Sequence, residues 1–148
     1  MKAKDILATK GKEILSIYEE ASVFDVVTTL TTHKIGFLIV TNTKAGVAGV
    51  ISERDVVQKC ISLQKDPAKI KAKEIMTPRG KLVSATEEED VQSIMNVMTE
   101  KKIRHLPIFD GDQLKGIISI GDVIKFILEA KESEIKTLTD YAFGQYPG

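Results

Sequence analysis

Apolar residues recur at helical spacing in two separate stretches of the chain. In each stretch they occupy positions i, i+3, i+4 and i+7, which is the pattern of an amphipathic helix. The first set is Val23, Val26, Val27 and Leu30, and the second is Val91, Ile94, Met95 and Met98. A valine-rich run alone would also suit a strand, but the methionines in the matching set favour helix for both.

Short apolar runs follow each of these helices. Residues 37–41 and 47–51, and again 105–109 and 114–118, predict two hairpin-like pairs of strands. A short strand is expected before each helix, near residues 15–17 and 82–84. A last helix should follow each hairpin, over residues 53–63 and 120–141. The predicted order is therefore β-α-β-β-α, twice, in an α+β fold.

The two halves are copies of one motif. When residues 15–40 are aligned with 83–108, identical residues fall at eight positions: Ser16, Glu19, Glu20, Val23, Thr31, Lys34, Ile35 and Leu38. Further on, Gly49, Ile51, Ser52, Asp55 and Val56 match Gly116, Ile118, Ser119, Asp122 and Val123. We expect a first repeat over 1–64, a polar connector over 65–72 and a second repeat over 73–148. One copy is too small to cover its own sheet, so the copies should pack together.

Composition narrows the function. The chain carries 21 Lys+Arg and 21 Asp+Glu, so its zero net charge argues against a nucleic-acid partner, which would need a basic face. No apolar run is long enough for a membrane span. One cysteine, Cys60, and two histidines give no metal-ligand pattern. A polar N-terminus without a signal-peptide core makes a cytoplasmic location the expectation.

A Ser-x-x-Asp motif stands at the start of the last helix in each copy, as Ser52/Asp55 and Ser119/Asp122. The plain interpretation is a capping box. The same geometry would also suit a ligand, because a helix N-terminus attracts phosphate and a carboxylate can accept both hydroxyls of a ribose cis-diol. The two roles can coexist. Gly49 and Gly116, upstream of each serine, indicate a close approach of backbones.

A basic pair, Arg104-His105, precedes the apolar run Leu106-Pro107-Ile108. It could be a solvated surface pair, or it could hold phosphate, since arginine offers a permanent fork for phosphate oxygens. The first copy has Gly36-Phe37 at this place. Phosphate binding there should be weaker, and Phe37 could cover or block a base.

The sequence resembles a CBS-domain pair, the Bateman module, over nearly its whole length. The resemblance lies in residues 49–55 (GVISERD), 116–122 (GIISIGD), 75–77 (IMT) and 103–108 (IRHLPI). It is especially similar to small stand-alone CBS-pair proteins. The resemblance implies two repeats related by a pseudo-twofold axis, adenine-nucleotide binding in clefts between them, and no catalysis.

The resemblance also implies which residues combine. One site would join Ser52, Arg54 and Asp55 with Val83, Ile103, Arg104, His105 and Pro107. The other would join Ser119 and Asp122 with Leu15, Ile35 and Phe37. The aliphatic members would sandwich an adenine, although plain core is their alternative role. The Asp55 site should be the tighter, because Arg54 and Arg104 lie near its phosphate.

Two functions stay open at this point. One is a regulatory module that binds an adenine nucleotide and senses energy or a metabolite, with AMP slightly favoured over ATP, ADP and NAD because three phosphates would need more cations. The other is a regulator of an unidentified protein partner, modulated by the nucleotide or by NAD or S-adenosylmethionine. An apolar stripe on the last helix predicts a homodimer through the C-terminal helices. No catalytic cofactor is expected.

Overall fold

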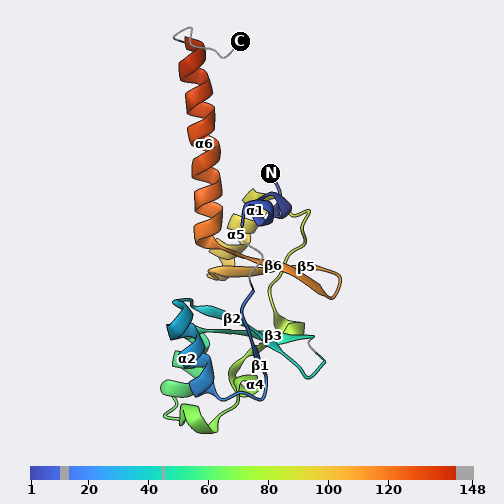
Figure 1. Cartoon of the computed structure of the whole chain (residues 1–148), viewed down its shortest axis with the longest axis vertical. Helices are drawn as coiled ribbons and strands as arrows, with labels where there is room; N and C mark the ends of the chain where they lie inside the picture. The colour runs from blue at the N-terminus through green and yellow to red at the C-terminus, as the bar shows by residue number, and fades with distance from the viewer. Residues whose placement is uncertain (11–13, 45, 143–148) are drawn as a thin grey trace. The chain divides into compact units, whose positions relative to one another are not determined.

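The computed structural model describes residues 1–10, 14–44 and 46–142 (Figure 1). These residues form a mixed α+β fold, as the sequence predicted. The end of the predicted second repeat, residues 143–148, lies outside the described residues. The chain divides into two compact units. Unit 1 combines Met1–Lys12 with Ser84–Gly148, and unit 2 is Glu13–Val83.

Unit 2 is built on a four-stranded sheet in the order β1-β2-β3-β4. Its strands are β1 (Ser16–Tyr18), β2 (Phe37–Thr41), β3 (Val47–Ser52) and β4 (Thr77–Pro78). β1 runs parallel to β2, while β2–β3 and β3–β4 are antiparallel pairs. The three strands predicted for this half of the chain are therefore confirmed, and the short strand β4 extends the sheet on the other side of β3.

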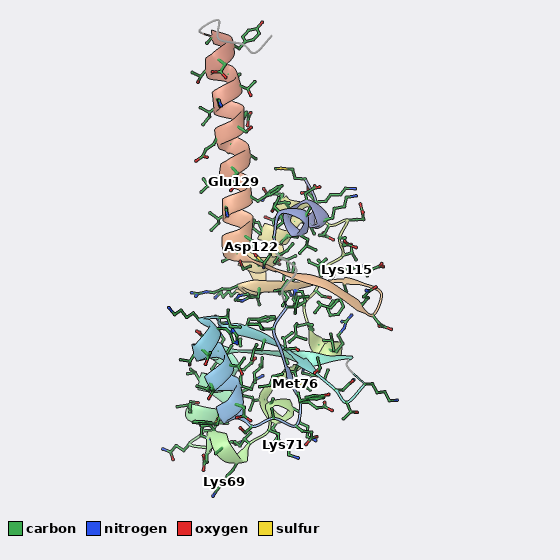
Figure 2. The ribbon with its side chains drawn as sticks, viewed as in Figure 1. Lys69, Lys71, Met76, Lys115, Asp122 and Glu129 are labelled. Atoms are coloured by element: carbon green, nitrogen blue, oxygen red, sulfur yellow. The ribbon has the colours of Figure 1, made fainter. Side chains whose placement is uncertain are left out.

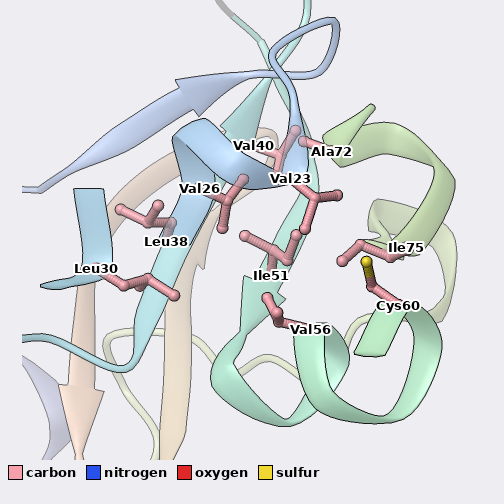
Figure 3. Packing of buried hydrophobic residues seen from close by; sticks show 10 residues of the cluster. All are labelled: Val23, Val26, Leu30, Leu38, Val40, Ile51, Val56, Cys60, Ala72 and Ile75. Atoms are coloured by element: carbon pink, nitrogen blue, oxygen red, sulfur yellow. The ribbon is translucent and has the colours of Figure 1, made fainter. Parts of the chain in front are cut away.

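Helices close the apolar face of this sheet. They are α2 (Val23–His33), α3 (Glu53–Val56), the π-helical η1 (Val57–Ile61) and α4 (Ala72–Ile75), with short 3-10 turns η2 (Pro67–Lys69) and η3 (Arg79–Lys81). Val23, Val26 and Leu30 on α2 are buried, which confirms the helical interpretation of that stretch. They pack with side chains of β2, β3, η1 and α4, including the fully buried Cys60 (Figure 3).

Unit 1 contains the antiparallel hairpin of β5 (His105–Asp110) and β6 (Gln113–Ser119). Gly111, at φ 60°, occupies the left-handed region in its turn. Three helices complete the unit: α1 (Ala3–Thr9), α5 (Val91–Lys101) and α6 (Ile120–Ala142). Val91, Ile94 and Met98 are buried on α5, so the second helical pattern is confirmed as well.

The two predicted amphipathic helices have matching ends. Ser22 caps α2 by accepting from Asp25 N, and Asp90 caps α5 by accepting from Gln92 N. Both helices end in a left-handed residue, Lys34 at φ 54° and Lys102 at φ 56°. The internal repeat seen in the sequence therefore extends to the backbone conformation at helix ends.

One predicted strand is wrong. Residues 82–84 form no strand, and only Ala85 makes an isolated parallel bridge, to Ile108. In the first copy, Ile39 N donates to Leu15 O at 3.2 Å, which ties β1 to β2. Pro107 takes the place of Ile39 in the second copy and has no N–H to donate. The missing donor explains why the second copy lacks the strand that corresponds to β1.

The helix predicted over residues 53–63 is also different in detail. The chain is α-helical only over Glu53–Val56 and then widens to the π-helical η1, which ends at Ile61. By contrast, α6 is a continuous α-helix over the whole predicted range 120–141 and ends one residue later, at Ala142. No helix among the described residues is both long enough and apolar enough to span a membrane.

Each repeat begins with a short helix, its head segment, and these two helices, α1 and α4, lie in unexpected units. α1 precedes the first copy in sequence but belongs to unit 1, where Ala3 N donates to Glu89 O at 2.8 Å and Lys4 N to Glu87 O at 3.0 Å. α4 lies in unit 2, where Ala72 N donates to Ala21 O at 2.7 Å. The compact units therefore do not coincide with the repeats 1–64 and 73–148, whose boundaries stay a prediction about the sequence duplication.

Candidate functional site

Ser52 and Asp55 form the predicted capping box at the junction of β3 and α3. Asp55 Oδ2 accepts from Ser52 N at 3.0 Å and from Ser52 Oγ at 3.2 Å, and Asp55 N donates to Ser52 Oγ at 3.2 Å. These reciprocal bonds fix the carboxylate at the first turn of the helix. The capping-box interpretation of the motif is therefore confirmed. A capped carboxylate can still accept hydrogen bonds from a ligand.

A lysine pairs with the same carboxylate. Lys59 Nζ lies 3.0 Å from Asp55 Oδ1, one turn along the chain, and also donates to Ile75 O at 3.1 Å. Asp55 is the more enclosed partner, with 13% of its side chain exposed against 44% for Lys59. Opposite charges four residues apart on a helix lie close together, so the spacing of Asp55 and Lys59 in the sequence indicates this pair.

Ser119 and Asp122 repeat the capping box at the junction of β6 and α6. Figure 2 labels Asp122 at the start of α6. Asp122 Oδ2 accepts from Ser119 N at 2.8 Å, and Asp122 N donates to Ser119 Oγ at 3.1 Å. The duplicated Ser-x-x-Asp motif thus gives the same local structure in both units, and each aspartate lies where a strand ends and a helix begins.

The cation beside Asp122 comes from the other end of the chain. Lys10, just past α1, donates through Nζ to Asp122 Oδ2 at 2.6 Å and to Ile117 O at 2.5 Å. Burial alone would raise the pKa of Asp122, but the hydrogen bonds from Lys10 and Ser119 outweigh burial, and the pKa of Asp122 is lowered. No local sequence pattern could connect residues so far apart, which is why the sequence analysis missed Lys10.

The two glycines upstream of the serines are positions of close approach. A Cβ on Gly49 would lie 2.2 Å from the backbone oxygen of Thr77, and one on Gly116 would lie 2.6 Å from Leu7 Cδ2. Thr77 follows α4, and Leu7 is on α1. The close approach expected at these glycines is therefore found, and the approaching groups come from the head segments.

The basic pair lies at the start of β5 in unit 1. Arg104 is exposed and His105 half-buried, while Pro107 is buried within the strand. Ile120 N donates to Arg104 O at 2.8 Å, which places this backbone against the first turn of α6. Unit 2 has the same arrangement, because Glu53 N donates to Gly36 O at 3.0 Å. Each segment therefore borders the capped helix of its own unit.

The predicted site residues divide between the units. Unit 2 contains Leu15, Ile35, Phe37, Ser52, Arg54, Asp55 and Val83, and unit 1 contains Ile103, Arg104, His105, Pro107, Ser119 and Asp122. Leu15 and Ile35 are half-buried against the core of unit 2, so both side chains contribute to core packing. Both predicted combinations take members from both units, and they stay predictions.

Over residues 1–10, 14–44 and 46–142, no group of three or more His, Cys, Asp or Glu side chains is arranged to hold a metal ion. The chemistry that these junctions offer is therefore that of fixed carboxylates, ammonium groups and backbone N–H groups. Such groups recognise hydroxyls and anions.

The family model for the CBS domain matches residues 3–62 and 72–129, which together span most of the chain. The chain belongs to the CBS-domain family. It carries two CBS domains, as the resemblance implied, and the relatives below include CBS proteins of similar size. The family residues begin with α1 and α4, so each domain in the family sense includes its head segment.

Among curated proteins, the chain is 32% identical over 148 residues to the mitochondrial CBS domain-containing protein CBSX3 of Arabidopsis thaliana, covering 96% of this chain and 72% of that protein. Among solved structures, a protein with CBS domains from Burkholderia ambifaria superposes with a TM-score of 0.80 at 30% identity, covering 87% of this chain and 95% of the other. The structural match therefore supports the same family as the family model.

Two more distant structures share the fold and contain ligands. The CBS domain pair of protein MJ0100, in complex with 5-methylthioadenosine and S-adenosyl-L-methionine, gives a TM-score of 0.73 at 23% identity and covers 88% of this chain and 98% of the other. The CBS domain protein PAE2072 of Pyrobaculum aerophilum, complexed with AMP, gives 0.71 at 21% identity and covers 82% and 89%.

Proposed function

We propose that this protein is a regulatory module that binds an adenine nucleotide and catalyses no reaction. The observation that carries the proposal is the duplicated strand–helix junction, in which Ser52/Asp55 and Ser119/Asp122 each hold a carboxylate at the first turn of a helix. A carboxylate fixed in this way can accept both hydroxyls of a ribose. Membership of the CBS-domain family supports the same role.

The remaining predicted residues complete the proposed sites. Val83, Ile103 and Pro107 would enclose one adenine, and Leu15, Ile35 and Phe37 the other. Arg104 and His105 would face the phosphate of the nucleotide bound at Asp55, with Arg54 beside it. Because arginine stays charged at all physiological pH values, it would give this site a constant preference for an anionic ligand.

AMP is the ligand we favour, ahead of ADP, ATP and NAD. The chain has zero net charge, and only a few cations stand among the predicted site residues. Three phosphates would need more positive charge than these positions provide. One structural neighbour is complexed with AMP, and another with 5-methylthioadenosine and S-adenosyl-L-methionine, so an adenosyl group is what these ligands share.

We also propose a homodimer formed largely through α6. Ile124, Leu128, Ile135 and Leu138 are between 46% and 64% exposed on this helix. Within unit 1, α6 leaves the hairpin and extends beyond α1 and α5 (Figure 1). A second copy offering the same stripe would bury these side chains in an isologous interface.

The second candidate function is control of another protein. Large apolar side chains are exposed on η1 as well as on α6, among them Val57 at 57% and Ile61 at 53%. Exposed apolar surface of this kind can dock a partner. In that case the nucleotide would tune the complex, and loss of nucleotide binding would alter partner affinity without abolishing it.

Calorimetric titration with AMP, ADP, ATP, NAD and S-adenosylmethionine separates the two candidates. We expect AMP to release or absorb heat on binding and to raise the melting temperature, since a ligand that binds only the folded state stabilises it. Absence of heat and of thermal stabilisation with all five ligands would exclude the nucleotide-binding function and leave control of another protein without a nucleotide. Turnover of any of them would contradict the non-catalytic proposal.

A further inference from the structure

The two fixed carboxylates differ in where their lysine comes from. Lys59 reaches Asp55 from within the same helical segment, whereas Lys10 reaches Asp122 from the segment after α1. Lys10 and Asp122 are both largely enclosed, with 33% and 27% of their side chains exposed. A partly enclosed pair of this kind is less screened than the surface pairs elsewhere on the protein.

Lys10 occupies an acceptor position that a ribose would need. A carboxylate oxygen has two lone pairs, and Asp122 Oδ2 already accepts from Ser119 N at 2.8 Å and from Lys10 Nζ at 2.6 Å. A cis-diol that donates to both carboxylate oxygens therefore has to displace Lys10 from Oδ2. The ammonium group displaced in this way then lacks an anionic partner.

The side chain can make this move while α1 stays in place. α1 is held at its other end, where Ala3 N donates to Glu89 O and Lys4 N to Glu87 O, and its middle is held where Leu7 packs on Gly116. Lys10 also donates to Ile117 O, which keeps its ammonium group close to Asp122. A ligand phosphate near the diol would give this ammonium a new partner, whereas a neutral nucleoside would not.

We propose that Lys10 makes the Asp122 site selective for adenine nucleotides that carry a phosphate over neutral nucleosides. This inference rests on the proposed function, because it needs a ribose on Asp122. Displacing Lys10 costs the same free energy for AMP and for adenosine, but only AMP has a phosphate that can form a new ion pair with the ammonium group. Lys10 is therefore a specificity-determining residue supplied by the head segment of the first repeat.

The test compares AMP with adenosine in an Asp55→Ala background, where only the Asp122 site remains. Lys10→Met should strengthen adenosine binding and leave AMP binding equal or weaker. The dissociation constant of adenosine divided by that of AMP should therefore fall about tenfold. Lys4→Met is the matched control, because Lys4 lies on α1 but pairs with Glu88 at 3.2 Å. It should leave the ratio unchanged, and melting temperatures should show that all variants are folded.

The outcomes separate this inference from the proposed function. If Lys10→Met leaves the adenosine-to-AMP ratio of dissociation constants unchanged, the role of Lys10 is overturned while ligand binding itself stands. If Asp55→Ala binds neither compound although the parent protein binds AMP, the Asp122 site takes no nucleotide and the inference also fails. If the parent protein binds neither AMP nor any other adenosyl ligand, the proposed function fails first.

Discussion

Leu7 packs directly on Gly116, and the matching Gly49 lies under the backbone of Thr77. The two contacts are equivalent in the repeat but differ in what could yield to a methyl group. At Gly116 the obstacle is the end of a flexible side chain, 2.6 Å from an added Cβ, whereas at Gly49 it is a carbonyl oxygen at 2.2 Å. The head segments thus lie against a glycine in both units, and Gly116 should tolerate an added methyl group better than Gly49.

Gly49→Ala should therefore destabilise the protein more than Gly116→Ala. Overpacking against backbone that cannot move should cost about 1–3 kcal/mol, and the change at Gly116 should cost less because Leu7 can adopt another rotamer. Urea unfolding of the two variants measures the difference. Adding Leu7→Ala to Gly116→Ala should relieve the clash. Equal losses at the two glycines would contradict this account.

Asp55→Ala and Asp122→Ala should each weaken nucleotide binding while the protein stays folded. Losing a charged acceptor for a diol typically costs about 1.5–3 kcal/mol, or roughly ten- to a hundred-fold in affinity. Each change also removes part of a capping box, so a modest drop in stability is expected. Ser22→Ala, which removes the cap of α2 and is not among the predicted site residues, is the control. If both aspartate variants bind AMP as the parent does, capping is their only role.

Arg104→Ala should lower the affinity for AMP about tenfold more than the affinity for adenosine, if Arg104 faces the phosphate of the nucleotide at Asp55. Titrations in an Asp122→Ala background isolate that site. Arg104→Lys keeps the charge and should retain part of the preference. Equal losses for AMP and adenosine would mean that Arg104 does not contact the phosphate.

Acid should weaken the attachment of α4 to unit 2. Glu20 accepts hydrogen bonds from Lys71 and Lys73 at 2.5 Å and 2.6 Å, and these bonds lower the pKa of Glu20 from 4.5 to about 2. A lowered pKa in the folded state means that the stabilisation is complete above pH 4.5 and is lost as the pH falls toward 2.

Glu20→Gln should therefore melt below the parent protein at neutral pH, and the gap should narrow between pH 4.5 and pH 2. The effect should be small and should shrink with added salt, because all three side chains are exposed. Melting curves at several pH values measure it. A gap that stays constant over this range would show that the charge of Glu20 does not stabilise the fold.

Replacing Leu128 and Leu138 by Asp should convert the proposed dimer to monomers, because both side chains lie on the exposed stripe of α6. Burying large aliphatic side chains is worth on the order of 1.5–3 kcal/mol each, and charged replacements reverse that gain. Light scattering measures the mass of the variant. Folding should survive because the buried side chains of α5 and α6, such as Ile94 and Val123, are unchanged. Thr137→Asp, off the apolar stripe, is the matched control. A parent protein that is monomeric at tens of micromolar would exclude the dimer.

Local pattern predicted most of the secondary structure. The apolar spacing located α2 and α5, and the short apolar runs located both hairpins, because burial on one face imposes a period on the sequence. The strand predicted at residues 82–84 is missing because it would need a backbone N–H at position 107, and Pro107 has none. Repeat symmetry alone therefore overestimated the likeness of the two copies.

The candidate site was predicted in its local part only. Ser52, Asp55, Ser119 and Asp122 form the capping boxes that their spacing indicated. Lys10 could not be found in this way, because its contact with Asp122 depends on where α1 docks. The Asp55 site is predicted to be the tighter because of Arg54 and Arg104, but Lys10 places a cation beside Asp122 as well.

Unit 1 is assembled from both ends of the described chain, with unit 2 inserted between them. During synthesis, residues 13–83 leave the ribosome together and can complete their own sheet and core at once. α1 emerges before unit 2, yet the surface that receives Leu7 and Lys10 is made only after unit 2, with β6 and the start of α6. α1 therefore cannot dock until β6 and the start of α6 have been made, and unit 2 should become protease-resistant well before unit 1.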